Sequence, residues 1–171
     1  TLTDAFLKAT HTVSVLDFTE RMMDSNIIEK EKGVTIKLAP VRMEYTVGDQ
    51  RYTLNLIDTP GHVDFGYEVS RSLAACEGAI LLVDATQGIQ AQTLANYQKA
   101  VDLGLKIIPV INKIDLPSAD VEQTVLEMMD LFGIDEKEVL YVSAKTGQGV
   151  ETVLQAIVDR VPPPTTTESS Q

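Results

Sequence analysis

Apolar residues in the second half of the chain fall into short unbroken runs separated by amphipathic segments. The runs at 79–83, 107–111 and 139–142 are almost entirely aliphatic. Unbroken runs of this length predict strands buried on both faces, as in a parallel sheet. Apolar positions with helical spacing follow each run, at 92–103, 118–132 and 150–161. This alternation predicts an α/β domain, doubly wound and mostly parallel, with helices on both faces of the sheet.

The first part of the chain has a different pattern. Residues 1–10 carry apolar side chains at i, i+3, i+4 and i+7, which predicts a helix, although no capping box is evident at its start. Loose alternation in 38–47 and 51–57, on either side of a turn at 48–50, predicts a β-hairpin. A further helix is expected over 63–76.

The helix predicted near residue 120 has recognisable ends. Ser118 is a candidate N-cap, and Gly133 ends the apolar periodicity. The apolar positions place Met128 and Met129 together on the inner face, where methionine fills gaps in a core.

Three polar loops follow predicted strands, and the first is Asp58-Thr59-Pro60-Gly61-His62. The carboxyl ends of strands in an open α/β sheet are where ligands bind. At such an edge, Asp58 could hold a metal-bound water. The backbone N–H of Gly61 could approach a phosphate oxygen, because glycine has no side chain in the way.

The second loop, Asn112-Lys113-Ile114-Asp115, follows the strand at 106–111. The Asp115 carboxylate can accept two hydrogen bonds from a base with adjacent N1–H and N2–H₂ donors, which guanine has and adenine lacks. Asn112 can either bond the base edge or tie neighbouring loops together. The aliphatic stem of Lys113 can lie across the ring.

The third loop, Ser143-Ala144-Lys145, ends the last predicted strand. It offers a backbone N–H for the guanine carbonyl, and Lys145 can stack on the base. Upstream, Thr35 follows Gly33 and Val34. Its hydroxyl can complete the oxygen shell of a Mg²⁺ ion.

Composition narrows the class of protein. A chain of 171 residues is long enough for one domain with a real core. The net charge of −11 argues against a general nucleic-acid binder, so no DNA partner is expected. A single cysteine, Cys76, suits a reducing compartment, and the apolar runs are too short to cross a membrane. We therefore expect a cytoplasmic protein.

Taken together, these motifs resemble the GTP-binding domain of translational GTPases. Residues 33–36 are similar to the first switch of that family, 58–62 to the second, and 112–115 with 143–145 to its guanine-reading loops. Within the family, segments 66–78 and 90–96 most resemble the elongation factor 4 group, also called LepA. The alternative is the BipA/TypA group, which Met23-Asp24-Ser25-Asn26 also resembles.

The resemblance implies a six-stranded sheet and hydrolysis of bound GTP to GDP and phosphate on the ribosome. It implies that His62 orients the attacking water beside the large-subunit RNA, with Val34 as part of an apolar gate. It further implies that Thr35 ligates Mg²⁺ in the GTP state and that Asp58 holds the ion through water. A monomer, and peripheral association with the inner face of the cell membrane, are also compatible with the resemblance.

One family motif does not occur in the 171 residues: the phosphate loop, Gly-x-x-x-x-Gly-Lys followed by Ser or Thr. By the family pattern Thr1 comes directly after it, which makes Thr1 a candidate nucleotide-binding residue. We expect a GTP-binding domain over 1–161 whose first strand and phosphate loop lie upstream, and a linker over 162–171. The alternative is a truncated fragment that keeps the guanine loops but cannot hold phosphates.

Overall fold

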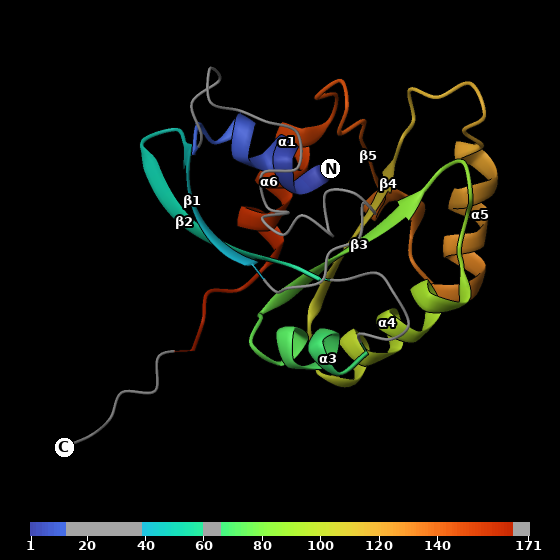
Figure 1. The fold of residues 1–171 in the computed structure, drawn as a ribbon, viewed down its shortest axis with the longest axis horizontal. Helices are drawn as coiled ribbons and strands as arrows, with labels where there is room; N and C mark the ends of the chain where they lie inside the picture. The colour runs from blue at the N-terminus through green and yellow to red at the C-terminus, as the bar shows by residue number, and fades with distance from the viewer. Residues whose placement is uncertain (13–38, 60–65, 166–171) are drawn as a thin grey trace, which may run out of the picture.

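The computed structural model describes residues 1–12, 39–59 and 66–165. Its elements are α1 (Leu2–Ala9), β1 (Ala39–Val47), β2 (Gln50–Asp58), α3 (Gly66–Ala74), β3 (Gly78–Asp84), α4 (Ala91–Asp102), β4 (Lys106–Asn112), α5 (Val121–Phe132), the 3₁₀ helix η2 (Glu136–Glu138), β5 (Leu140–Tyr141) and α6 (Val150–Arg160) (Figure 1). Of the expected linker, 162–165 are described and have no regular structure.

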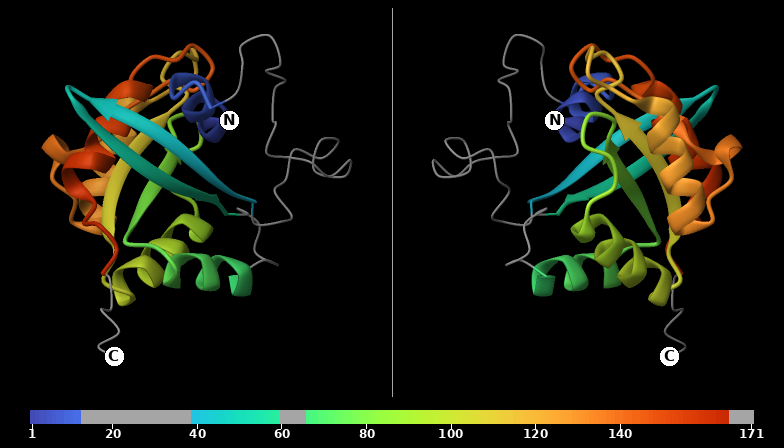
Figure 2. Two further views of the ribbon diagram at one scale, coloured as in Figure 1. Left: turned by 90° about the vertical axis from the view of Figure 1, so that its left-hand side faces the viewer. Right: turned by 90° about the vertical axis from the view of Figure 1, so that its right-hand side faces the viewer.

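The strands form two sheets within the described residues. β1 and β2 are an antiparallel hairpin, as predicted, and β3, β4 and β5 are parallel in that order. Figure 2 shows the hairpin running obliquely to β3 and β4. The expected single sheet of six strands is therefore not seen in this part of the chain, because β2 and β3 do not pair with each other.

Side chains of β4 alternate between two apolar layers, which confirms the doubly wound α/β arrangement. Ile108 and Val110 pack in a cluster with α1 and α6, whereas Ile111 packs in a second cluster with α5. All three are fully buried. Because successive strand residues point to opposite faces, one strand serves both cores. The helices accordingly cover both faces of the parallel sheet (Figure 1).

The hairpin is held to the first of these clusters by β1. Met43 and Tyr45 are buried there against residues of α1 and α6. The Tyr45 hydroxyl donates to Glu151 of α6 at 3.4 Å. Burial, together with the nearby negative charge of Glu151, raises the pKa of Tyr45. The hairpin thus packs against α1 and α6, although it forms no hydrogen-bonded ladder with β3.

Two helix starts differ from the sequence prediction. A capping box does begin α1: the Thr1 hydroxyl oxygen accepts from Asp4 N–H at 3.3 Å. Asp120, not Ser118, caps α5 and accepts from Gln123 N–H at 3.0 Å. Both serine and aspartate suit this role, so propensity alone did not distinguish them. Gly133 ends α5 as predicted, at φ +64°.

Met128 and Met129 were predicted to share the inner face of α5, but only Met128 lies there. Met128 is fully buried, whereas 39% of Met129 is exposed. Adjacent residues on a helix are about 100° apart, so both rarely fit a narrow buried stripe. In the part of the chain that the structure describes, no helix is long and apolar enough to cross a membrane.

Candidate nucleotide-binding site

Asn112, the last residue of β4, joins the carboxyl ends of all three parallel strands. Its backbone carbonyl accepts from Ala85 N–H, just after β3, at 3.0 Å. Its side-chain Oδ1 accepts from Ala144 N–H, just after β5, at 3.1 Å. Of the two roles predicted for Asn112, the structure therefore displays the one that ties neighbouring loops together.

A second link joins the loops after β4 and β5 through the backbone. Ile114 N–H donates to Val142 O at 3.4 Å, and Val142 N–H donates to Ile111 O at 2.8 Å. The segments 112–115 and 143–145 are therefore side by side, although about 30 residues separate them in sequence. Such an edge is the usual ligand side of an open α/β sheet.

Ser143 determines the shape of the loop after β5. It is fully buried, and its N–H donates to Gln148 O at 2.9 Å. Its hydroxyl oxygen accepts from Thr146 N–H at 3.2 Å, and its carbonyl accepts from Gly147 N–H at 2.8 Å. These bonds close a tight turn at which Ala144 is half-buried and Lys145 is exposed.

The amide of Ala144 is already used by Asn112. A base carbonyl arriving at this loop would have to share that N–H or meet the next one, of Lys145. The predicted carbonyl contact thus has two candidate donors in the same turn.

Lys113 has a left-handed backbone, with φ +63°, which is uncommon for a residue other than glycine. Its ammonium Nζ lies 2.7 Å from Oδ2 of Asp84, the last residue of β3. The other carboxylate oxygen of Asp84 accepts from both the N–H (2.8 Å) and the hydroxyl (2.6 Å) of Thr86. Partial burial tends to raise the pKa of Asp84, but Lys113 and Thr86 outweigh it and the net pKa lies below its ordinary value.

Asp115 and Lys145 are exposed at this edge, as is Lys113. Among the described residues, the ion pairs do not include Asp115. A carboxylate that is exposed and unpaired at a ligand edge is available to accept hydrogen bonds from a bound molecule.

Asp58 ends β2, as predicted, and contacts the first helix. The Thr3 hydroxyl of α1 donates to Asp58 Oδ2 at 3.1 Å. Within the described residues there is no group of three or more His, Cys, Asp or Glu that could hold a metal. One carboxylate fits Mg²⁺, which is usually held by one or two protein carboxylates with phosphates and water rather than by a full protein cage.

Gly61, His62 and Thr35 lie outside the described residues. Thr1 lies at the start of α1, two residues before Thr3, whose bond to Asp58 brings this end of the helix to the end of β2.

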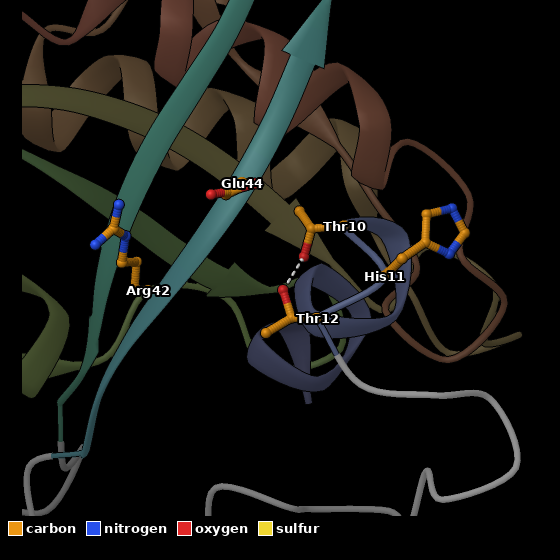
Figure 3. Close-up of a pocket in the computed structure, with 5 residues that line it drawn as sticks. All are labelled: Thr10, His11, Thr12, Arg42 and Glu44. Carbon is orange, nitrogen blue, oxygen red and sulfur yellow. Dashed lines mark hydrogen bonds between the residues drawn. The ribbon is translucent and has the colours of Figure 1, made fainter.

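A pocket of about 330 Å³ among the described residues lies elsewhere. It is lined by Thr10, His11 and Thr12 at the end of α1, and by Arg42 and Glu44 of β1. The hydroxyls of Thr10 and Thr12 bond to each other at 2.7 Å (Figure 3). None of the predicted site residues lines this pocket, so it gives no support to the predicted site.

Sequence reasoning did not single out Asp84 or Thr3. Asp84 ends an aliphatic strand, and Asp58 ends a strand of alternating apolar and polar residues, so the argument applied to Asp58 would also have found Asp84. Thr3 gave no such signal, because its bond to Asp58 spans 55 positions and depends on how α1 packs.

Comparison with known proteins gives the family. The model of the elongation factor Tu GTP-binding domain matches residues 1–163. This chain belongs to that family. An elongation factor 4 from Syntrophomonas wolfei is 60% identical over 96% of the chain, and one from Thermotoga maritima is 58% identical over the same share. The chain spans only 28% and 27% of those two proteins. The resemblance to the elongation factor 4 group is thereby confirmed.

Solved structures agree on the fold of this GTP-binding domain. A crystal structure of a protein from Thermus thermophilus matches 96% of the chain with a TM-score of 0.80 at 17% identity, and the match covers 38% of that protein. A bacterial selenocysteine-specific elongation factor matches 91% of the chain with a TM-score of 0.67 at 28% identity, and the match covers 26% of that factor. The first likeness shows the fold alone.

Proposed function

We propose that this domain binds GTP and GDP and that residues 112–115 and 143–145 read the guanine base. The observation that carries the proposal is the position of Asn112. It holds the ends of β3, β4 and β5 together through two hydrogen bonds, which brings both loops to one edge. A preorganised edge lowers the entropy lost when a ligand binds.

Base selection would rest on Asp115. Its exposed carboxylate can accept from both N1–H and N2–H₂ of guanine, whereas adenine would leave it without donors. The stems of Lys113 and Lys145 would flank the ring, since lysine combines an apolar stem with a charged end. The carbonyl of guanine would meet an N–H of Ala144 or Lys145.

The phosphates and Mg²⁺ would be held by residues outside these two loops. Asp58 would hold Mg²⁺ through water, Thr35 would ligate it, and Thr1 and Gly61 would lie beside the phosphates. When bound, Mg²⁺ neutralises charge that develops on the phosphate oxygens. The oxygen of Asp58 that contacts Thr3 suggests that α1 helps to orient this carboxylate.

For the whole protein we propose ribosome-dependent hydrolysis of GTP, with His62 orienting the attacking water. Support comes from the elongation factor 4 relatives, at 60% and 58% identity. Translation takes place in the cytoplasm, and we propose that location for this protein. A monomeric state, the absence of a DNA partner, and association with the membrane surface remain predictions from the resemblance and the charge.

The test uses the full-length protein, because the phosphate-loop motif does not occur in these 171 residues. Release of phosphate from GTP is measured with and without ribosomes, for the wild type and for His62→Ala. We expect ribosomes to stimulate the wild type strongly, and the variant to bind GDP normally while losing most of the stimulation. Equal rates with and without ribosomes would contradict the proposed activity.

A further inference from the structure

The contact between Lys113 and Asp84 is the shortest ion pair among the described residues, at 2.7 Å. It crosses from the end of β4 to the end of β3. The two strands are paired so that Asp84 lies opposite Asn112, the neighbour of Lys113. The side chain of Asp84 is 22% exposed and that of Lys113 is 49% exposed. The lysine is therefore held at its charged end while about half of its surface remains open to a ligand.

The Asp84 side chain is also held by hydrogen bonds other than its contact with Lys113. One carboxylate oxygen accepts two hydrogen bonds from Thr86, which leaves the other directed at Lys113. The backbone after it is fixed as well. Ala85 N–H donates to Asn112 O at 3.0 Å, and Ala85 O accepts from Asp120 N–H at 2.8 Å. An anchor held by several bonds can orient a flexible partner.

A free lysine side chain samples many rotamers and loses conformational entropy when a ligand fixes it. Here the backbone of Lys113 (φ +63°) and the carboxylate of Asp84 fix both ends of the side chain. A flat ring that packs on the stem then meets a side chain that is already ordered. The gain is preorganisation, which needs no contact between Asp84 and the ligand.

We propose that Asp84 is a positioning residue of the guanine site: it holds the Lys113 ammonium so that the lysine stem is ordered as one wall for the base. The proposal rests on the proposed function, since it assigns Asp84 a role in the same site. Asp84 acts through Lys113 and does not touch the nucleotide.

The test is a double-mutant cycle in the full-length protein. Affinity and dissociation rate of a fluorescent GDP are measured for wild type, Asp84→Asn, Lys113→Met and the double variant. Asparagine keeps the shape of Asp84 and its bonds to Thr86 but removes the charge. We expect Asp84→Asn to weaken GDP binding about three- to tenfold, mainly through faster dissociation. In the Lys113→Met background the same change should alter affinity less than about twofold.

Asp102→Asn is the matched control. Asp102 is exposed on α4 and accepts from Gln98 at 2.8 Å. The same chemical change is therefore made away from the carboxyl ends of the strands. It should leave GDP binding unchanged. If Asp84→Asn lowers the melting temperature, Asp84→Glu is used as well. Glutamate keeps the charge and should restore part of the affinity.

Equal losses from Asp84→Asn in both backgrounds would overturn the proposal, because Asp84 would then act on folding of the loop rather than on Lys113. An unchanged affinity for Asp84→Asn would also overturn it. Wild-type protein that binds GDP no better than ADP would be a different failure: it would overturn the proposed function and this inference with it.

Discussion

The side-chain oxygen of Asn112 accepts a hydrogen bond from the backbone N–H of Ala144 at 3.1 Å. This bond joins two loops that lie 32 positions apart and that were each predicted to read guanine. Together with the bond from Ala85 N–H to the Asn112 carbonyl, it makes Asn112 the common support of three strand ends.

Asn112→Ala should lower both the affinity for GDP and the free energy of unfolding. The change removes the acceptor of the Ala144 N–H, and losing a bond of this kind costs about 1–3 kcal/mol in free energy of unfolding. We expect GDP affinity to fall at least about tenfold, equivalent to about 1.4 kcal/mol. Both are measured on the full-length protein, by chemical denaturation and by fluorescent GDP titration. Asn96→Ala is the control, because in the part of the chain that the structure describes the Asn96 side chain bonds only to Gln92 of the same helix. Equal affinity for the two variants would contradict this role.

Gly149→Ala should destabilise the domain far more than Gly104→Ala. Both glycines have similar positive φ, +75° and +69°, so both variants incur about 1 kcal/mol of backbone strain. An added Cβ at Gly149 would clash with the carbonyl oxygen of Tyr141, whereas nothing lies within 4 Å of a Cβ at Gly104. We expect the Gly149 variant to lose at least about 2 kcal/mol more in free energy of unfolding. Chemical denaturation measures both losses. Similar losses of unfolding free energy for the two variants would contradict the prediction, because they would mean that the backbone moves and relieves the close contact at residue 149.

Met128→Ala and Met129→Ala form a second matched pair. Met128 is fully buried, and emptying such a site costs about 2–5 kcal/mol. Met129 is 39% exposed, so its truncation should cost less than about 1 kcal/mol. Chemical denaturation of both variants tests the placement of α5, and a larger loss for Met129→Ala would mean that the helix is rotated.

The ion pair between Lys113 and Asp84 predicts a dependence on pH. Because the pKa of Asp84 is lowered from its ordinary value of 3.8, the pair stabilises the folded state above that value. The contribution is lost as pH falls through the lowered pKa. The difference in melting temperature between wild type and Lys113→Met should therefore be constant near neutral pH and shrink below about pH 4. A difference that grows on acidification would contradict the pairing.

The hairpin, the parallel strands and most helices were predictable, because each depends on a local pattern. Strand β4, for example, is predicted by five consecutive apolar residues at 107–111. The N-cap of α5 was not predictable, since Ser118 and Asp120 both fit the local signal and packing decided between them. Met129 was misplaced for a similar reason: the width of the buried stripe depends on what covers it.

The candidate site was predictable in its residues but not in its connections. Asn112 and Ala144 were expected at one edge because both follow strands. The ion pair of Lys113 with Asp84 depends on the register of β3 against β4 and on a left-handed backbone at Lys113. Neither can be read from composition or spacing. The contact of Thr3 with Asp58 likewise depends on tertiary packing.

The central claim, that this edge reads guanine through Asp115, is tested most directly by nucleotide competition. GDP, ADP and xanthosine diphosphate compete with fluorescent GDP on full-length wild type and Asp115→Asn. Xanthine has a carbonyl where guanine has its N2 amino group, so an amide at position 115 can pair with it. We expect the wild type to favour GDP over ADP by at least about 10³-fold. The variant should lose GDP affinity and gain affinity for xanthosine diphosphate. If Asp115→Asn leaves the three affinities in their wild-type ratio, Asp115 does not read the base and the account is wrong.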